Sequence, residues 1–297
     1  MTGRLPDWFK QKMPTSQAMN NVQNVLRDLH LHTVCQSALC PNIGQCFSKQ
    51  TATFLILGDT CTRNCTFCAV NKGIPQVPDG DEPENIAKAV SYLGLKHVVI
   101  TSVTRDDLAD GGANHFARVI NRLKESNLGL TIEVLIPDFK GSLDALEVVV
   151  NACPEVVNHN IETVPRLYPT VRPMAGFQRS LELLANVKKI KSGMTTKSGI
   201  MVGLGETREE ILNALDALRK AKCDLLTIGQ YLQPSTKHHP VIRFVPPEEF
   251  EDLSRVAREM GFRDVASAPL VRSSFNAAHL YHRSLIEAEN VRIQSIN

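Results

Sequence analysis

The chain lacks several features that would place it in common protein classes. It has no apolar run near the roughly 20 residues that a membrane-spanning helix needs. Residues 1–9 lack the apolar core of a secretory signal peptide, and residues 1–20 are too mixed in character for a transit peptide. It also lacks an excess of one charge, because 33 basic and 31 acidic side chains give a formal net charge of +2. We therefore expect neither a nucleic-acid partner nor a membrane partner.

What the chain does have is an uneven distribution of its eight cysteines. Six of them fall within the first 68 residues, in two groups of three. In a small secreted domain this density would indicate disulfides, but in a chain of 297 residues without a signal peptide it indicates metal binding in a reducing cytoplasm. The other two, Cys153 and Cys223, lie between expected helices and strands, and we interpret them as structural.

The second cysteine group has the clearer chemistry. Cys61, Cys65 and Cys68 have C-x3-C-x2-C spacing and directly follow a strand-like run at 53–57. Three thiolates so close together can bind three irons of a 4Fe–4S cube and leave the fourth iron open for a small molecule. Four-cysteine electron-transfer sites use other spacings. A structural zinc site needs a fourth ligand and a second, C-x2-C-like pair, which the chain does not supply, so we favour the cluster over zinc.

The first group consists of Cys35, Cys40 and Cys46, with C-x4-C-x5-C spacing. These gaps are too wide for consecutive ligands on one helical turn, and Pro41 and Gly44 predict an irregular loop. A loop that wraps three corners of a second cube fits this spacing. The fourth ligand must then come from elsewhere in the chain.

Beyond the cysteine groups, strand-like and helix-like runs alternate. The strand-like runs are 53–57, 97–103, 130–136, 156–159, 199–202 and 225–230. The helix-like runs between them are 81–93, 112–125, 143–151, 178–191 and 207–221, and an amphipathic helix is expected within 16–31. Six β-α units with continuous apolar strands predict an α/β fold, a partial (β/α)6 TIM-like barrel. We expect an N-terminal extension at 1–50, a barrel core at 51–235 and a C-terminal extension at 236–297.

Polar residues occur at the strand ends, where ligands bind in such folds. Glu133 is informative because a carboxylate within an apolar strand must be paired or functional. His159 is equally compatible with a satisfied interior histidine and with a ligand. From their position within a strand, at its end or just beyond it, the candidate cavity residues are Thr101, Ser102, Glu133, Asn158, Glu162 and Arg172.

The two cysteine groups in this order resemble those of the lipoyl synthase family of radical S-adenosylmethionine (SAM) enzymes. Further segments carry the resemblance, which covers about residues 5–275: the approach to Cys61 through 58–60, Asn-His-Asn at 158–160 and Arg-Ser-Ser at 272–274. The resemblance implies that Cys61, Cys65 and Cys68 hold the cluster that binds SAM. It implies an auxiliary 4Fe–4S cluster on Cys35, Cys40 and Cys46, with Ser274, or alternatively Ser273, as its fourth ligand.

The resemblance also implies a reaction. A sulfurtransferase of this family inserts two sulfur atoms at carbons 6 and 8 of an octanoyl chain carried on a lysine of a lipoyl carrier domain. A 5′-deoxyadenosyl radical derived from SAM would remove hydrogen from the chain, and the auxiliary cluster would supply the sulfur and be consumed. The six cavity residues would bind SAM. The implied protein partners are carrier domains of dehydrogenase E2 subunits and of the glycine cleavage H protein, a ferredoxin or flavodoxin as electron donor, and iron–sulfur carrier proteins.

Three alternatives remain on the residues alone. Another radical SAM enzyme that inserts sulfur or transfers a methylthio group would share the second cysteine group, but the first group and the serine motif favour lipoyl synthases. An iron–sulfur electron carrier has no use for six β-α units with polar strand ends. A zinc-stabilised binding module is the third alternative, and it differs from the others by being colourless.

Overall fold

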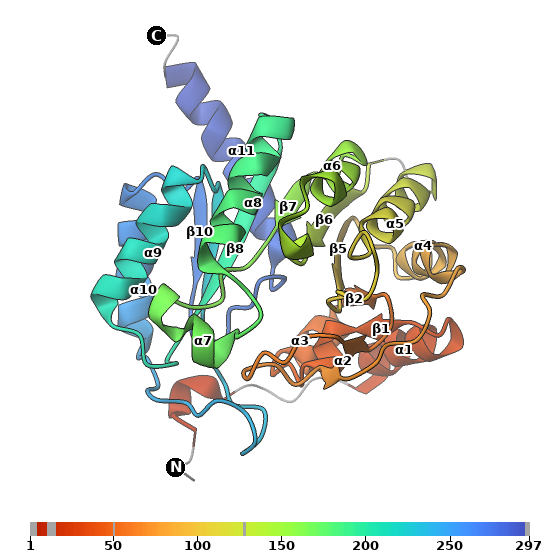
Figure 1. Ribbon diagram of the computed structural model, residues 1–297, viewed down its shortest axis with the longest axis horizontal. Helices are drawn as coiled ribbons and strands as arrows, with labels where there is room; N and C mark the ends of the chain where they lie inside the picture. The colour runs from red at the N-terminus through yellow and green to blue at the C-terminus, as the bar shows by residue number, and fades with distance from the viewer. Residues whose placement is uncertain (1–4, 11–15, 50, 127–128, 295–297) are drawn as a thin grey trace.

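One sheet of eight strands forms the centre of the computed structural model, which describes residues 5–10, 16–49, 51–126 and 129–294. In spatial order the strands are β1 (His32–Thr33), β2 (Thr53–Ile56), β5 (His97–Ser102), β6 (Thr131–Leu135), β7 (Val156–Asn158), β8 (Thr195–Val202), β9 (Leu225–Gln230) and β10 (Asp264–Ser267). Every neighbouring pair is parallel except β1 with β2. The strand order follows the chain, and its two ends, β1 and β10, are the edges of an open barrel (Figure 1).

Helices that connect the parallel strands cover the outside of this sheet (Figure 1). They are α4 (Glu82–Tyr92), α5 (Ala113–Ser126), α6 (Leu143–Asn151), α8 (Phe177–Ile190), α9 (Arg208–Lys220) and α10 (Pro247–Glu259). Helix α9 begins with a capping box, since the Thr207 hydroxyl accepts from the Glu210 amide and the Glu210 carboxylate accepts from the Thr207 amide. Among the described residues, no helix is long and apolar enough to span a bilayer.

The remaining elements are short or lie at the two ends of the chain. They are η1 (Asp7–Phe9), α1 (Ser16–Asp28), α2 (Val34–Ser37), α3 (Ile43–Ser48), β3 (Thr60–Cys61), β4 (Asn71–Lys72), η2 (Phe139–Gly141), η3 (Pro165–Leu167), α7 (Tyr168–Val171) and α11 (Ala277–Gln294). Phe9 of η1 packs against Phe244, with ring centroids 5.7 Å apart, and anchors the N-terminal segment on the barrel.

The predicted α/β barrel is confirmed, with two corrections to its strands. Strand β8 begins at Thr195, before the expected start at Gly199, because the side chains of Thr-Thr-Lys-Ser are buried although they are polar. The sequence pattern also missed two strands of the sheet, β1, which pairs antiparallel with β2, and β10, which pairs in parallel with β9. The C-terminal extension that we expected at 236–297 therefore contributes a strand to the barrel sheet.

The irregular loop predicted for the first cysteine group is wrong at both of its ends. Cys35 lies in α2 and Cys46 lies in α3, so that only Cys40 occupies the turn between the two helices. Helix α2 begins there because the side chain of Thr33 accepts a hydrogen bond from the Gln36 amide, at 3.3 Å. The group is thus held by two short helices beside β1 and β2 (Figure 1).

The segment 270–275, which we call the serine segment, passes close to the inner face of the barrel. A Cβ placed on Gly229 would lie 2.1 Å from the carbonyl oxygen of Val271, and one on Gly199 would lie 3.0 Å from the Ser273 hydroxyl oxygen. The side-chain amide of Asn42 donates to the Leu270 carbonyl at 2.7 Å. Glycines at these two strand positions therefore allow the serine segment to reach the first cysteine group.

Candidate active site

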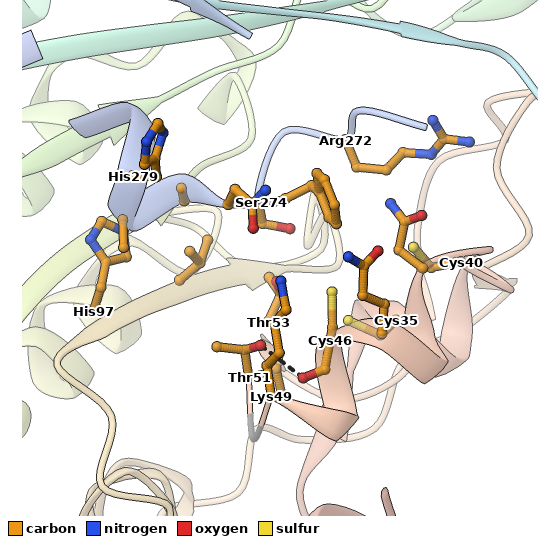
Figure 2. Close-up of a pocket in the computed structure, with 18 residues that line it drawn as sticks. Cys35, Cys40, Cys46, Lys49, Thr51, Thr53, His97, Arg272, Ser274 and His279 are labelled. Carbon is orange, nitrogen blue, oxygen red and sulfur yellow. Dashed lines mark hydrogen bonds between the residues drawn. The ribbon is translucent and has the colours of Figure 1, made fainter. Parts of the chain in front are cut away.

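A cavity of about 220 Å³ brings the first cysteine group and the serine segment together. Cys35, Cys40, Cys46 and Ser274 all line it. Figure 2 shows the three thiols on the side of α2 and α3, and Ser274 on the chain that leads into α11. Ser273 does not line this cavity. Its hydroxyl instead accepts a hydrogen bond from the Asn160 side-chain amide at 2.6 Å.

Burial disfavours the thiolate form in this cavity. It raises the pKa of Cys35 to about 11, and the neighbouring Cys40 adds to the effect. Burial likewise raises the pKa of Cys46 to about 12, with further contributions from Cys35 and Cys40. The thiolates of Cys35 and Cys46 are therefore stable here only beside a compensating positive charge, which is what iron supplies.

A second cavity, of about 490 Å³, contains the other cysteine group and reaches the first. Its wall includes Cys61, Cys65 and Cys68 together with Cys35 and Cys40. Burial raises the pKa of Cys68 to about 12. The larger cavity thus lies between the two groups, and a molecule within it has access to both.

Buried charges fix the loop that carries the second group. The Arg63 guanidinium binds Asp106 at 2.7 Å and the fully buried Asp138 at 2.6 Å. The sulfur of Cys61 accepts from the backbone amides of Arg63 and Thr104, both at 3.4 Å. Sequence analysis did not select Arg63, and the signal for it was its place inside the C-x3-C-x2-C motif.

Four of the six candidate SAM-binding residues line the larger cavity, namely Thr101, Ser102, Glu162 and Arg172. The Ser102 hydroxyl, the Asn160 side-chain oxygen and the Arg172 Nε in its wall are buried without a hydrogen-bond partner. Buried polar atoms normally have partners, so these orphans fit a polar ligand such as SAM. Asn160 is a further site residue that sequence analysis missed, although it lies within the Asn-His-Asn motif.

Arg172 and Glu162 place opposite charges beside the second cysteine group. Burial raises the pKa of the Glu162 carboxyl, and Arg172 opposes that shift. Glu162 also has a φ of 64°, an unusual backbone conformation for this residue type. The guanidinium of Arg172 donates to the carbonyl oxygens of Asn160 and Ile161 at 3.0 and 3.1 Å, which holds it at the cavity wall.

Glu133 and Asn158, the other two candidates, do not line either cavity. The Glu133 carboxylate binds the Lys197 ammonium at 2.7 Å and accepts from the Asn158 amide at 3.2 Å, in a fully buried layer of the barrel. A carboxylate in this strand was expected to be either paired or functional, and Glu133 is paired. We do not carry either residue into the proposed SAM site.

The structure also shows the surroundings of His159, Cys153 and Cys223. His159 has both ring nitrogens bonded, to the Ile136 carbonyl and the Ser180 hydroxyl, and its pKa is lowered to about 4 by burial. This supports its interpretation as a satisfied interior histidine. Cys153 and Cys223 line neither cavity.

Comparison with known proteins gives the family. The sequence model of the Radical SAM superfamily matches residues 55–218, and the N-terminal domain of lipoyl synthase of the Radical SAM family matches residues 2–40. Lipoyl synthase of Caldicellulosiruptor bescii is 56% identical over 287 residues, covering 97% of each chain. The chain belongs to the lipoyl synthase family. Lipoyl synthase of Alkaliphilus metalliredigens is 55% identical over 275 residues, covering 93% of this chain and 95% of its own.

A solved structure supports the fold independently. HydG, a maturase of the FeFe hydrogenase, matches with a TM-score of 0.58 at 12% identity, covering 84% of this chain and 62% of its own. As a lipoyl synthase family member, the chain is a radical SAM sulfurtransferase that uses SAM and 4Fe–4S clusters and acts on lipoyl carrier proteins. Within the described residues, no three His, Cys, Asp or Glu side chains converge to hold a single metal ion. A cube does not require such convergence, because each thiolate binds a separate iron.

Proposed function

We propose that Cys61, Cys65 and Cys68 hold the SAM cluster, and that Cys35, Cys40, Cys46 and Ser274 hold the auxiliary cluster. The observation that carries this assignment is the larger cavity, whose wall contains thiols of both groups. An octanoyl chain within it would reach both the source of the radical and the source of the sulfur. When bound, the two clusters would supply these two halves of the chemistry.

Ser274 is our choice over Ser273 because of their different partners. Ser274 lines the smaller cavity with the three thiols, whereas the Ser273 hydroxyl is already bonded to Asn160. A serine oxygen is a harder and less usual ligand for iron than a thiolate. One weaker corner suits a cluster that gives up its sulfur during the reaction.

The chain's own residues would bind and orient SAM. Arg172 offers Nε without a partner, which suits the SAM carboxylate, and Glu162 offers an acceptor for its ammonium group or hydroxyls. The Ser102 hydroxyl and the Thr101 side chain lie in the same wall. The enclosing barrel would keep water and other hydrogen donors away from the radical.

The proposal extends to partners and location. The carriers would be E2 subunits of dehydrogenase complexes and the glycine cleavage H protein. A ferredoxin or flavodoxin would supply electrons to the SAM cluster, and iron–sulfur carrier proteins would rebuild the auxiliary cluster after each turnover. A reducing cytoplasm suits six thiols that must stay available for iron.

The test compares cysteine and serine variants after anaerobic reconstitution. One variant replaces the three cysteines of the first group by alanine, and another those of the second group. Each should lose about half of the bound iron. The first variant should still cleave SAM but leave an octanoyl-lysine peptide unchanged, and the second should do neither. Ser274→Ala should alter the electron paramagnetic resonance signal of the auxiliary cluster and block sulfur insertion, whereas Ser273→Ala should keep the serine ligand. Equal effects of the two serine variants would contradict the choice of Ser274.

A further inference from the structure

Leu39 has a backbone conformation that leucine disfavours. It follows α2 with a φ of 51°, in the left-handed region where helices commonly end with glycine. Any residue with a Cβ is less stable than glycine in this conformation. Leu39 nevertheless donates its amide to the Gln36 carbonyl at 3.1 Å, so the strained turn is well formed.

Packing within the chain does not compensate for this strain. Leu57 and Phe139 also have positive φ, but they are 1% and 5% exposed, so their burial offsets the cost. Leu39 is 66% exposed. The other exposed residues with positive φ in the described part of the chain are polar, such as His30 and Lys222. Packing within the folded chain therefore does not explain an exposed apolar side chain on a strained backbone, and this combination indicates contact with another molecule.

The position of Leu39 indicates which molecule it contacts. It directly precedes Cys40 and lines the larger cavity, which the second cysteine group lines as well. Because two thirds of the residue is exposed, it forms part of the cavity rim rather than its floor. We propose that Leu39 is a substrate-binding residue whose side chain packs on the octanoyl chain where that chain enters the cavity. This inference builds on the proposed positions of the two clusters.

The physical basis is burial of apolar surface. The exposed part of the Leu39 side chain would leave water on contact with the acyl chain, which favours binding. Glycine at the same position would relieve the backbone strain but offer no apolar surface. Leu39 thus exchanges stability of the free protein for affinity to its substrate, and the two effects are separable by mutation.

The experiment measures binding and stability of Leu39→Gly, Leu39→Ala and Leu39→Met in the anaerobically reconstituted protein. The ligands are an octanoylated lipoyl carrier domain and the same domain without the octanoyl group. We expect Leu39→Gly to raise the Kd of the octanoylated domain by roughly five- to thirtyfold, to leave the Kd of the unmodified domain unchanged, and to melt no lower than wild type. Leu39→Ala should weaken binding similarly but melt below Leu39→Gly, and Leu39→Met should bind within about threefold of wild type.

Lys222→Gly is the matched control, because Lys222 is polar, exposed and has a φ of 61° at the end of α9. It should gain stability without a change in either Kd. An unchanged Kd in Leu39→Gly, or equal weakening for both forms of the carrier domain, would overturn the role of Leu39. Binding requires no turnover. The two proposals can therefore fail separately. A wild-type enzyme that adds no sulfur would contradict the proposed function, and an unchanged Kd in Leu39→Gly would contradict this inference.

Discussion

The buried charge pair of Lys197 and Glu133 gives a quantitative test of how the barrel is held. Their side chains are 1% and 0% exposed, and Lys197 Nζ lies 2.7 Å from Glu133 Oε1. The second carboxylate oxygen has no hydrogen bond, and its neighbour His97 Nε2 is 3.6 Å away. Burial by itself raises the pKa of Glu133, but Lys197 and His97 together outweigh it, so that the pKa lies below its usual value. The Lys197 ammonium is thus the nearest charged partner of this carboxylate, which also accepts a hydrogen bond from Asn158.

Lys197→Met removes that ammonium and keeps most of the side-chain volume. It should lower the free energy of unfolding by about 3–5 kcal/mol at neutral pH, because it leaves a buried carboxylate without its partner. Lys197→Met combined with Glu133→Leu should recover most of the loss, since an apolar pair of similar size avoids the burial of charge. Arg255→Ala is the control, because the Arg255–Glu259 pair is 60% and 62% exposed, and it should leave the free energy of unfolding nearly unchanged.

The pH dependence of the single variant has a defined sign. Without Lys197, burial, the largest single influence on Glu133, would be opposed by His97 but no longer by an ammonium group. We therefore expect its pKa to rise above the unfolded value, so that the protonated form is favoured in the folded state. The deficit of Lys197→Met should therefore shrink as pH falls and grow as pH rises. Urea unfolding followed by circular dichroism, anaerobically and at matched iron content, measures both effects. A loss below about 1 kcal/mol, or a double variant no better than the single one, would refute this account.

Three further predictions concern the cavity walls. Because the folded pKa of His159 is about 4, below its usual 6.5, the wild type should lose stability as pH falls from about 6.5 to 4, and His159→Gln should lose less. Gly199→Ala should displace the serine segment and deplete auxiliary-cluster iron, because its Cβ would lie only 3.0 Å from the Ser273 hydroxyl oxygen. Arg63→Met should lower SAM-cluster iron and destabilise the fold by about 1–3 kcal/mol, because buried Asp138 loses one of its two guanidinium partners and keeps Arg179.

Controls for these predictions come from the same chain. Gly193→Ala meets no atom within 4 Å of its Cβ and should keep full auxiliary iron. An equal loss of iron in Gly193→Ala and Gly199→Ala would contradict the close approach of the serine segment. An acid dependence that is identical in His159→Gln and wild type would show that other groups determine it. Normal SAM-cluster iron in Arg63→Met would mean that the loop does not depend on this guanidinium.

The sequence by itself was sufficient for the family, the fold class and the two cysteine groups. Cysteine spacing is a local property, and three thiols within eight residues, as at Cys61–Cys68, lie close together in any fold. The alternation of apolar strands with amphipathic helices likewise determines a parallel α/β sheet, because periodicity reports which side of each element is buried. Helix starts such as that of α9 followed from capping residues adjacent in sequence.

Tertiary structure decided everything that depends on side chains distant in sequence. Glu133 lies within a strand and Glu162 just beyond one, yet the first pairs with Lys197 in a buried layer and the second lines the cavity. Ser273 and Ser274 are neighbours in the chain, yet Ser273 binds Asn160, 113 positions away, whereas Ser274 lines the smaller cavity with the three thiols. The left-handed backbone conformation of Leu39 does not follow from any pattern in the sequence around it. Such differences arise because burial and partners are set by the packing of whole elements, which a local pattern does not specify.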